Sequence, residues 1–142
     1  MRLAAAGTRW RRVEAALRHW ARANQNMSYI SAEEWQLLAF FEVEPMRLDS
    51  DVPWPYNDFT YERALSDVSV TFAVAPAYKD FTLTVERGGR KEIELSALSV
   101  FDIRYNNSAG VEWLEILLTE RDRIELRLKP SFSLIGRVRS SN

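Results

Sequence analysis

The fold class is decided by the stretch FTLTVERGGRKEIEL, residues 81–95. Apolar side chains occupy alternate positions on either side of its glycine pair, which is the period of a β-strand with one buried face. A three-residue loop at 87–89 pairs Leu83 with Ile93 and keeps both apolar sets on one face, whereas a two-residue turn separates them. The stretch therefore predicts an antiparallel hairpin with a bulged loop.

The same alternation continues through most of the chain. A four-residue loop pairs Ile103 with Leu114, and a three-residue loop pairs Ile116 with Leu126, so strands adjacent in sequence are expected to be adjacent in the sheet. The alternating segments are 68–74, 81–86, 92–95, 101–105, 113–118, 123–128 and 132–138. The pattern predicts an α+β protein: an antiparallel β-meander of six to seven strands with one or two N-terminal helices packed on its apolar face.

One helix is expected at 32–43. Ser31 and Glu34 form the S-x-x-E pattern of a capping box, and Pro45 limits the helix at its other end. The helix is apolar most of the way round, which predicts that it is buried. The proline-containing stretch 44–58 after it is expected to be a linker-like loop.

The N-terminal residues differ in charge from the rest. Residues 1–26 hold six arginines and one acid, a net charge of +5, while 27–142 hold 13 basic and 19 acidic residues, a net charge of −6. A helical stripe in the first segment suits a membrane surface, an organelle presequence or a nucleic-acid arm; it also suits docking on the domain, or an upstream extension of a chain starting at Met27. We predict a basic helical extension at 1–26, dispensable for folding, and a single α+β domain at 27–142. The stripe consists of Trp10, Val13, Leu17 and Trp20.

Several chemistries are excluded by what the sequence lacks. It has no cysteine and one histidine, His19, so it offers no disulfide, no thiolate nucleophile and no site needing two imidazoles. No phosphate-binding glycine loop and no G-x-S-x-G motif is present. We therefore predict no catalytic residue, no metal site and no cofactor. The overall net charge of −1 gives no reason to expect nucleic acid, no apolar run could span a membrane, and a cytoplasmic location is expected.

A first candidate binding site is the aromatic segment 53–61, which proline restrains and which lies outside the predicted strands. Tryptophan and tyrosine in such a loop can anchor a partner or stack on a ligand, and with asparagine and aspartate they suit the faces of sugars. The opposing interpretation is that Trp54, Phe59 and Tyr61 plug the open end of the sheet. The candidate residues are Trp54, Tyr56, Asn57, Asp58 and Tyr61.

A second candidate site is the polar face of the last strands. The predicted register sets Asp102 opposite Glu115 and Glu115 opposite Arg127. Beside them it sets Arg104 opposite Trp113 and Trp113 opposite Lys129. This row is either a carboxylate pair of the glycosidase kind or a ladder of cross-strand ion and cation–π pairs. An indole on the solvent face either docks a partner or is covered by another part of the chain. The candidates here are Arg104, Trp113, Glu115 and Arg127.

Three function classes remain open. The preferred hypothesis is a non-catalytic protein-binding module, an inhibitor- or immunity-type partner of a bacterial toxin or enzyme. It is favoured by the acidic balance of 27–142 and by the aromatic candidates. The alternative is a small-ligand or carbohydrate binder, or a minor enzyme, with a site between helix 32–43, loop 44–58 and the sheet. The third is a homodimer whose outer strands pair across the contact.

Overall fold

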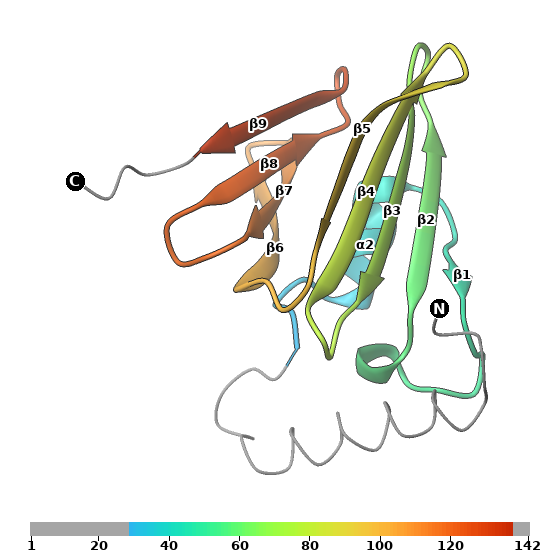
Figure 1. Cartoon of the computed structure of the whole chain (residues 1–142), viewed down its shortest axis with the longest axis vertical. Coiled ribbons are helices and arrows are strands. Elements are labelled where there is room, and N and C mark those ends of the chain that lie inside the picture. The colour runs from blue at the N-terminus through green and yellow to red at the C-terminus, as the bar shows by residue number, and fades with distance from the viewer. Residues whose placement is uncertain (1–28, 138–142) are drawn as a thin grey trace.

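The computed structural model describes residues 29–137, which form one α-helix and nine strands (Figure 1). The helix α2 spans Glu34–Phe41, and a short 3-10 helix spans Trp54–Tyr56. The strands are β1 Met46–Arg47, β2 Phe59–Ala64, β3 Ser69–Ala75, β4 Asp80–Arg87, β5 Arg90–Ala97, β6 Asp102–Ser108, β7 Val111–Leu117, β8 Arg123–Arg127 and β9 Ser133–Arg137. The predicted helix at 1–26 lies outside the described residues. No helix within 29–137 has the length and apolarity needed to cross a membrane.

The predicted α+β class with antiparallel, meandering strands is confirmed. Every paired strand runs antiparallel to its neighbour, and sheet order follows sequence order. The strands divide into a five-stranded sheet, β1 to β5, and a four-stranded sheet, β6 to β9. Two of the nine strands, β1 and β2, fall where a loop was expected or just after it. In β2 the alternation of buried Phe59 and Tyr61 with less buried Thr60 was present in the sequence, but preceding turn residues obscured it.

The predicted turn lengths were wrong, although the predicted buried faces of the strands were right. The hairpin of β4 and β5 turns at Gly88 and Gly89, whose φ angles of 60° and 78° suit glycine. A bulge lies before this turn, between Val85 and Glu86, and Val85 pairs with Ile93. The register is thus two residues from the predicted one. Similar shifts of two occur at the other turns, where Ile103 pairs with Ile116 and Leu114 with Leu126. A shift of two keeps every side chain on its predicted face.

The prediction that Ser31 and Glu34 cap α2 was also wrong. Glu33 is the N-cap, and it exchanges hydrogen bonds with Gln36: the Glu33 backbone N–H donates to the Gln36 side chain at 2.8 Å. Ser31 instead binds Asp102 of β6, both through its backbone N–H at 2.8 Å and through its hydroxyl at 2.5 Å. Ser31 therefore does not cap the helix, because its hydroxyl is used in a tertiary contact with β6.

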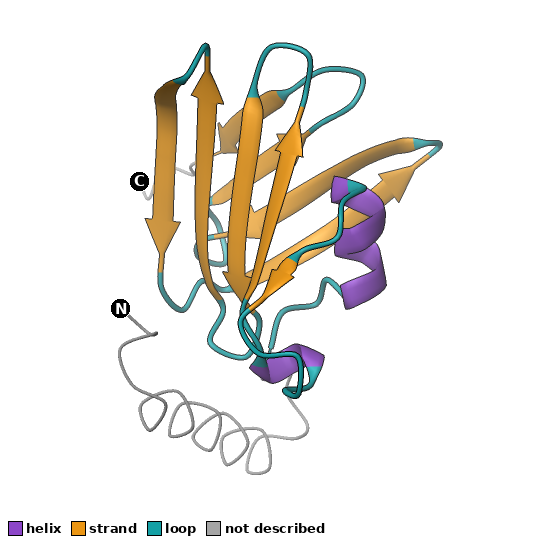
Figure 2. Cartoon of the chain, turned by 90° about the vertical axis from the view of Figure 1, so that its right-hand side faces the viewer, coloured by secondary structure: helices purple, strands orange, loops and turns teal. Residues whose placement is uncertain are grey.

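The helix is buried on one face only, which corrects the prediction of a fully buried helix. Leu37, Phe40 and Phe41 face the core, while the Trp35 side chain is 61% exposed. The helix ends at Glu42, whose left-handed backbone (φ 60°) stops it before Pro45 is reached. It packs against β2 of one sheet and against β6 and β7 of the other, so it closes one side of the space between the sheets (Figure 2).

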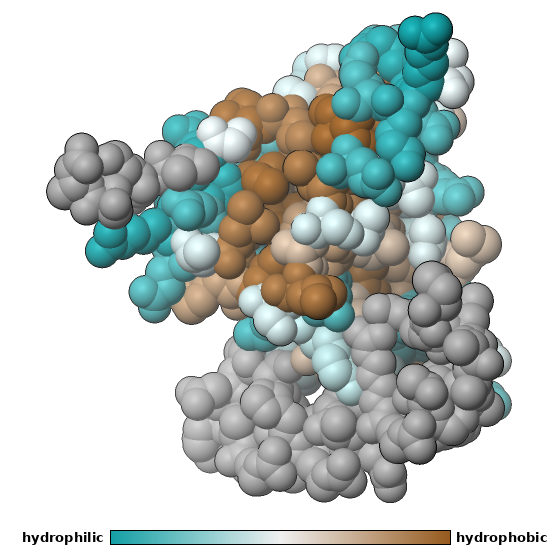
Figure 3. All heavy atoms as spheres, in the orientation of Figure 1, coloured by the Kyte–Doolittle hydropathy of each residue, from teal (hydrophilic) through white to brown (hydrophobic). Residues whose placement is uncertain are grey.

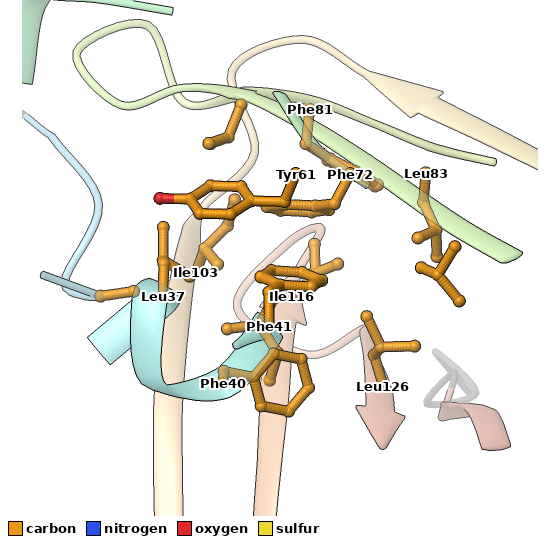
Figure 4. Packing of buried hydrophobic residues seen from close by; sticks show 14 of the residues in the cluster. Leu37, Phe40, Phe41, Tyr61, Phe72, Phe81, Leu83, Ile103, Ile116 and Leu126 are labelled. Carbon is orange, nitrogen blue, oxygen red and sulfur yellow. The ribbon is translucent and has the colours of Figure 1, made fainter. Parts of the chain in front are cut away.

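The core lies between the two sheets and α2 (Figure 4). Phe41 of the helix stacks on Tyr61 of β2 and Phe72 of β3, with ring centroids 4.9 and 5.4 Å apart. Ile103 and Ile116 close the core from the four-stranded sheet. Figure 3 shows apolar surface in the middle of the face that Figure 1 presents, between the two sheets. Side chains of α2 and of both sheets therefore meet in one core.

Candidate partner-binding face

The outward face of the four-stranded sheet gathers arginine, acidic and aromatic side chains; we call it the arginine face. Along β6, β7 and β8 the apolar side chains Ile103, Leu114 and Leu126 point into the core, so the residues between them point outward. All four sequence candidates of this region lie on it. The arginine face consists of Asp102, Arg104, Asn106, Trp113, Glu115, Arg123, Glu125, Arg127, Ser133, Ile135 and Arg137.

The neighbours within this face differ from those predicted, because the register is shifted by two residues. Arg104 pairs with Glu115 across the strands, and Trp113 pairs with Asn106. Leu117, not Glu115, lies opposite Asp102, so the predicted pair of facing carboxylates is not formed. The Arg127 guanidinium lies over the Trp113 ring, 5.4 Å from its centroid, as a cation–π contact.

Each carboxylate of the arginine face lies beneath an arginine. Asp102 is paired with Arg104 at 3.1 Å, and Glu115 is paired with Arg123. Glu125 is paired with Arg137 at 3.2 Å; its side chain is 12% exposed, whereas that of Arg137 is 60% exposed. The pattern is the same in all three pairs, so the face presents guanidinium groups to solvent while the carboxylates are covered.

Arg127 is the arginine of this face that has no carboxylate partner among residues 29–137. Its Nε is buried without a hydrogen bond, and so is the side-chain nitrogen of Asn106 on the other side of Trp113. A buried polar group left unpaired costs about 1–3 kcal/mol, and such groups are normally satisfied by a partner. The row Asn106–Trp113–Arg127 therefore has unused hydrogen-bonding capacity beside an aromatic surface.

Several residues of this face were missed by the sequence interpretation: Asn106, Arg123, Glu125, Ser133, Ile135 and Arg137. The alternation in 123–128 already placed Arg123, Glu125 and Arg127 on one side. Strand β9 was harder to align, because Pro130 precedes it and Gly136 interrupts its apolar pattern. Correct pairing of β8 with β9 brings Ser133 opposite Arg127 and Ile135 opposite Glu125.

The aromatic segment 53–61 is split between surface and interior. Tyr61 is fully buried in the core, and its burial raises the pKa of its phenol. Asn57 is 2% exposed, and its amide donates to the carbonyl of Val52 at 3.1 Å while its oxygen accepts from the backbone N–H of Asp58 at 2.8 Å. Asn57 and Tyr61 therefore hold the fold together, which corrects their listing as binding residues. The opposing interpretation, that the aromatic residues of this segment fill the core, is right for Phe59 and Tyr61.

The remaining candidates of that segment, Trp54, Tyr56 and Asp58, are partly exposed. Trp54 packs on Phe59 with ring centroids 4.5 Å apart. One open hollow, of about 490 Å3, is lined by Trp54 and by 29–35, including the first residues of α2. Another, of about 470 Å3, lies on the outer side of the five-stranded sheet beside Asp58. The sequence predicted a ligand site between the helix, the loop 44–58 and the sheet. The first hollow is lined by the helix and the loop, and the second by the loop and the sheet, so neither lies between helix and sheet.

A second charged cluster lies where α2 meets the four-stranded sheet. Lys129 binds Glu42 at the end of the helix, and Arg63 binds the same carboxylate at 2.8 Å. The hydrogen bonds from Lys129 and Arg63 lower the pKa of Glu42 below its usual 4.5. Lys129 also lies 3.8 Å from Glu112, which accepts a hydrogen bond from the Tyr105 hydroxyl. Within 29–137, no group of three or more histidine, cysteine, aspartate or glutamate side chains is arranged to hold a metal.

Comparison with known proteins yields one informative similarity. No protein-family model matches the chain, and no curated protein matches it. A solved chain from the contact-dependent growth inhibition toxin–immunity protein complex of Klebsiella pneumoniae 342 has a similar structure, with a TM-score of 0.65 and 21% sequence identity. The match covers 79% of this chain and 98% of that chain, so the two share a fold over nearly the whole length of the second.

Proposed function

We propose that this chain is a non-catalytic protein-binding module of the immunity type, which binds a toxin-like protein and blocks its action. The observation that carries the proposal is the fold shared with a chain of a toxin–immunity protein complex. The arginine face supports it, because arginine and tryptophan are enriched where protein partners dock and where binding energy is concentrated.

Two features favour the blocking member of such a complex over the toxic member. The carboxylates Asp102 and Glu115 are each bound by an arginine of the same sheet, and they do not face each other as the predicted glycosidase-like pair would. The second feature is that α2 and both sheets meet in one hydrophobic core, and that the two hollows described above lie outside the junction of helix and sheets. We further propose action in the cytoplasm, because the lack of cysteine fits that compartment.

Growth protection tests the proposal. The tagged chain is purified from its native host, and the protein that co-purifies in a saturable manner is expressed alone in a naive strain. The expected result is arrested growth, which co-expression of the chain restores. An unrelated β-protein expressed at the same level is the control. A bound protein that has no effect on growth, or an arrest that the chain leaves unchanged, contradicts the proposal.

Sugar binding is a second candidate, supported by the hollow beside Trp54 and Trp35 with Glu33 and Glu34 at its rim. Tryptophan rings stack on sugar faces, and carboxylates accept from hydroxyl groups. Titration of a glycan panel against intrinsic tryptophan fluorescence tests it, with Trp54→Leu as the matched variant. A fluorescence change of equal size in both proteins contradicts it. Homodimerisation through the outer strands is a separate hypothesis, which sedimentation at two concentrations decides.

A further inference from the structure

We propose that Arg127 is the anchor of the arginine face and that it binds the carboxylate of an aspartate or glutamate of the partner protein, above the ring of Trp113. The inference rests on the proposed function and deepens it, because it specifies which surface the partner covers and which chemistry it brings. It also predicts that the partner is acidic at the point of contact.

The first support is the pairing of charges. Of the four arginines on the face, three already bind a carboxylate of the same sheet: Arg104 binds Asp102, Arg123 binds Glu115, and Arg137 binds Glu125. Within the part of the chain that the structure describes, Arg127 has none. The positive charge that is left over is therefore located at one residue. Arginine is the side chain best suited to bind a carboxylate with two parallel hydrogen bonds.

The second support is the local hydrogen bonding. Arg127 Nε and the Asn106 side-chain nitrogen lie on either side of Trp113, and both are buried donors without an acceptor in residues 29–137. Carboxylate oxygens are acceptors only, so a partner carboxylate supplies what both donors lack, once the side chains turn toward it. Trp113 holds the guanidinium by its ring and offers apolar area beside the charge.

Ile135, 41% exposed on β9, adds apolar surface at the margin of the same face. An apolar margin that excludes water around a charged contact is typical of the residues that dominate protein interfaces. The alternative occupant is a nucleic acid, because guanidinium groups also bind phosphate. The apolar margin at Ile135 favours a protein surface over a nucleic acid, and binding of nucleic acid is one outcome of the test.

The first experiment needs no partner. Isotope-labelled full-length chain is titrated with a hexaglutamate peptide, and the side-chain N–H signals of the arginines and of the Trp113 indole are followed by NMR. We expect the largest shifts at Arg127 and Trp113. Equal shifts at Arg104, Arg123 and Arg137 would overturn the assignment, because they indicate a general attraction. Tighter binding of a six-nucleotide DNA than of hexaglutamate would also overturn it.

The matched variants exploit the pairing of β8 with β9. Ser133 lies directly opposite Arg127, so Ser133→Asp places a carboxylate within reach of the guanidinium inside the chain itself. We expect this variant to lose the hexaglutamate shifts while it melts at or above the temperature of the natural chain. Ser133→Asn has nearly the same shape without the charge, and it should retain the shifts. Loss in both variants, or in neither, contradicts the inference.

The second experiment uses the partner that passes the growth-protection test. Arg127→Ala is expected to weaken its binding about 30-fold or more, and Arg127→Lys about tenfold, since lysine keeps the charge but loses the fork of donors. Arg87→Ala is the control, because Arg87 lies at the far hairpin, bound to Asp67 and Glu92. Undiminished affinity in Arg127→Ala refutes the inference while leaving the proposed function intact. Site-specific hexaglutamate binding without any toxin-like partner refutes the proposed function alone.

Discussion

Replacing Tyr61 by phenylalanine is expected to stabilise the protein. The Tyr61 ring is fully buried between Phe41 and the strands, and its hydroxyl points out of the ring cluster (Figure 4). Among the residues that the structure describes, this hydroxyl has no hydrogen-bond partner. Tyr61→Phe removes this hydroxyl and keeps the stacking on Phe41 at 4.9 Å. The substitution therefore removes an unfavourable group and leaves the favourable packing in place.

The size of the effect follows from the cost of a buried, unpaired hydroxyl. Protein substitution data put that cost at about 1–3 kcal/mol. We expect a gain near the lower end, about 1 kcal/mol, because the denatured chain is not fully extended and the hydroxyl lies at the edge of the ring cluster. For a domain of this size, 1 kcal/mol corresponds to about 4 °C in Tm.

Urea unfolding and thermal melting of the two proteins measure the difference directly. Tyr105→Phe is the matched control, since the Tyr105 hydroxyl donates to Glu112 and its loss should lower stability by about 1 kcal/mol. The opposite signs separate a specific effect of the hydroxyl from a general effect of removing tyrosine. A loss of stability in Tyr61→Phe would refute the reasoning, because it would mean that the Tyr61 hydroxyl has a partner, such as an enclosed water molecule.

Three further predictions concern stability. Asp102→Ala should cost about 3 kcal/mol in urea unfolding, because it breaks a buried carboxylate network that ties Ser31 to β6; an unchanged midpoint contradicts this. Glu42→Gln should destabilise at neutral pH, and the difference from the natural chain should disappear as the pH falls below 4.5 and through the lowered pKa; a difference that persists in acid argues against the Lys129 pair. A chain of 27–142 should melt within a few degrees of the full-length protein, and a large loss would show that 1–26 is needed for folding.

The meander was readable from the sequence because its signal is a period of two residues. Leu83, Ile103 and Leu126 point into the core as their parity requires. Parity is insensitive to a shift of two residues, which is why three loop lengths could be misjudged without turning any strand over. Turn conformation depends on the φ angles of one or two residues. Ala109 adopts a left-handed φ of 53°, which alanine rarely does, so the sequence does not predict this turn.

For the candidate sites too, the sequence predicted the face of each residue but not its cross-strand partner. Arg104, Trp113, Glu115 and Arg127 were placed on a common face because parity alone decides the face. Their partners were misassigned, because a partner depends on register. For Tyr61 the sequence left two interpretations open, a binding residue and a core residue. It could not decide between them, because the prolines and turn residues before Tyr61 resemble a linker and its burial comes from contacts with α2 and β3.

By itself, the sequence determined which side chains of strands β3 to β8 turn inward, that these strands run antiparallel and that a helix precedes them. These properties depend on neighbours a few residues apart along the chain. Only the tertiary structure decided the division into two sheets, the half-exposed helix and the pairing of Ser133 with Arg127. It also decided that Arg127, unlike the other arginines of its face, forms no ion pair with an acid of residues 29–137. They depend on which distant segments share the core and on registers set by a bulge and a few turn angles, so no local pattern encodes them.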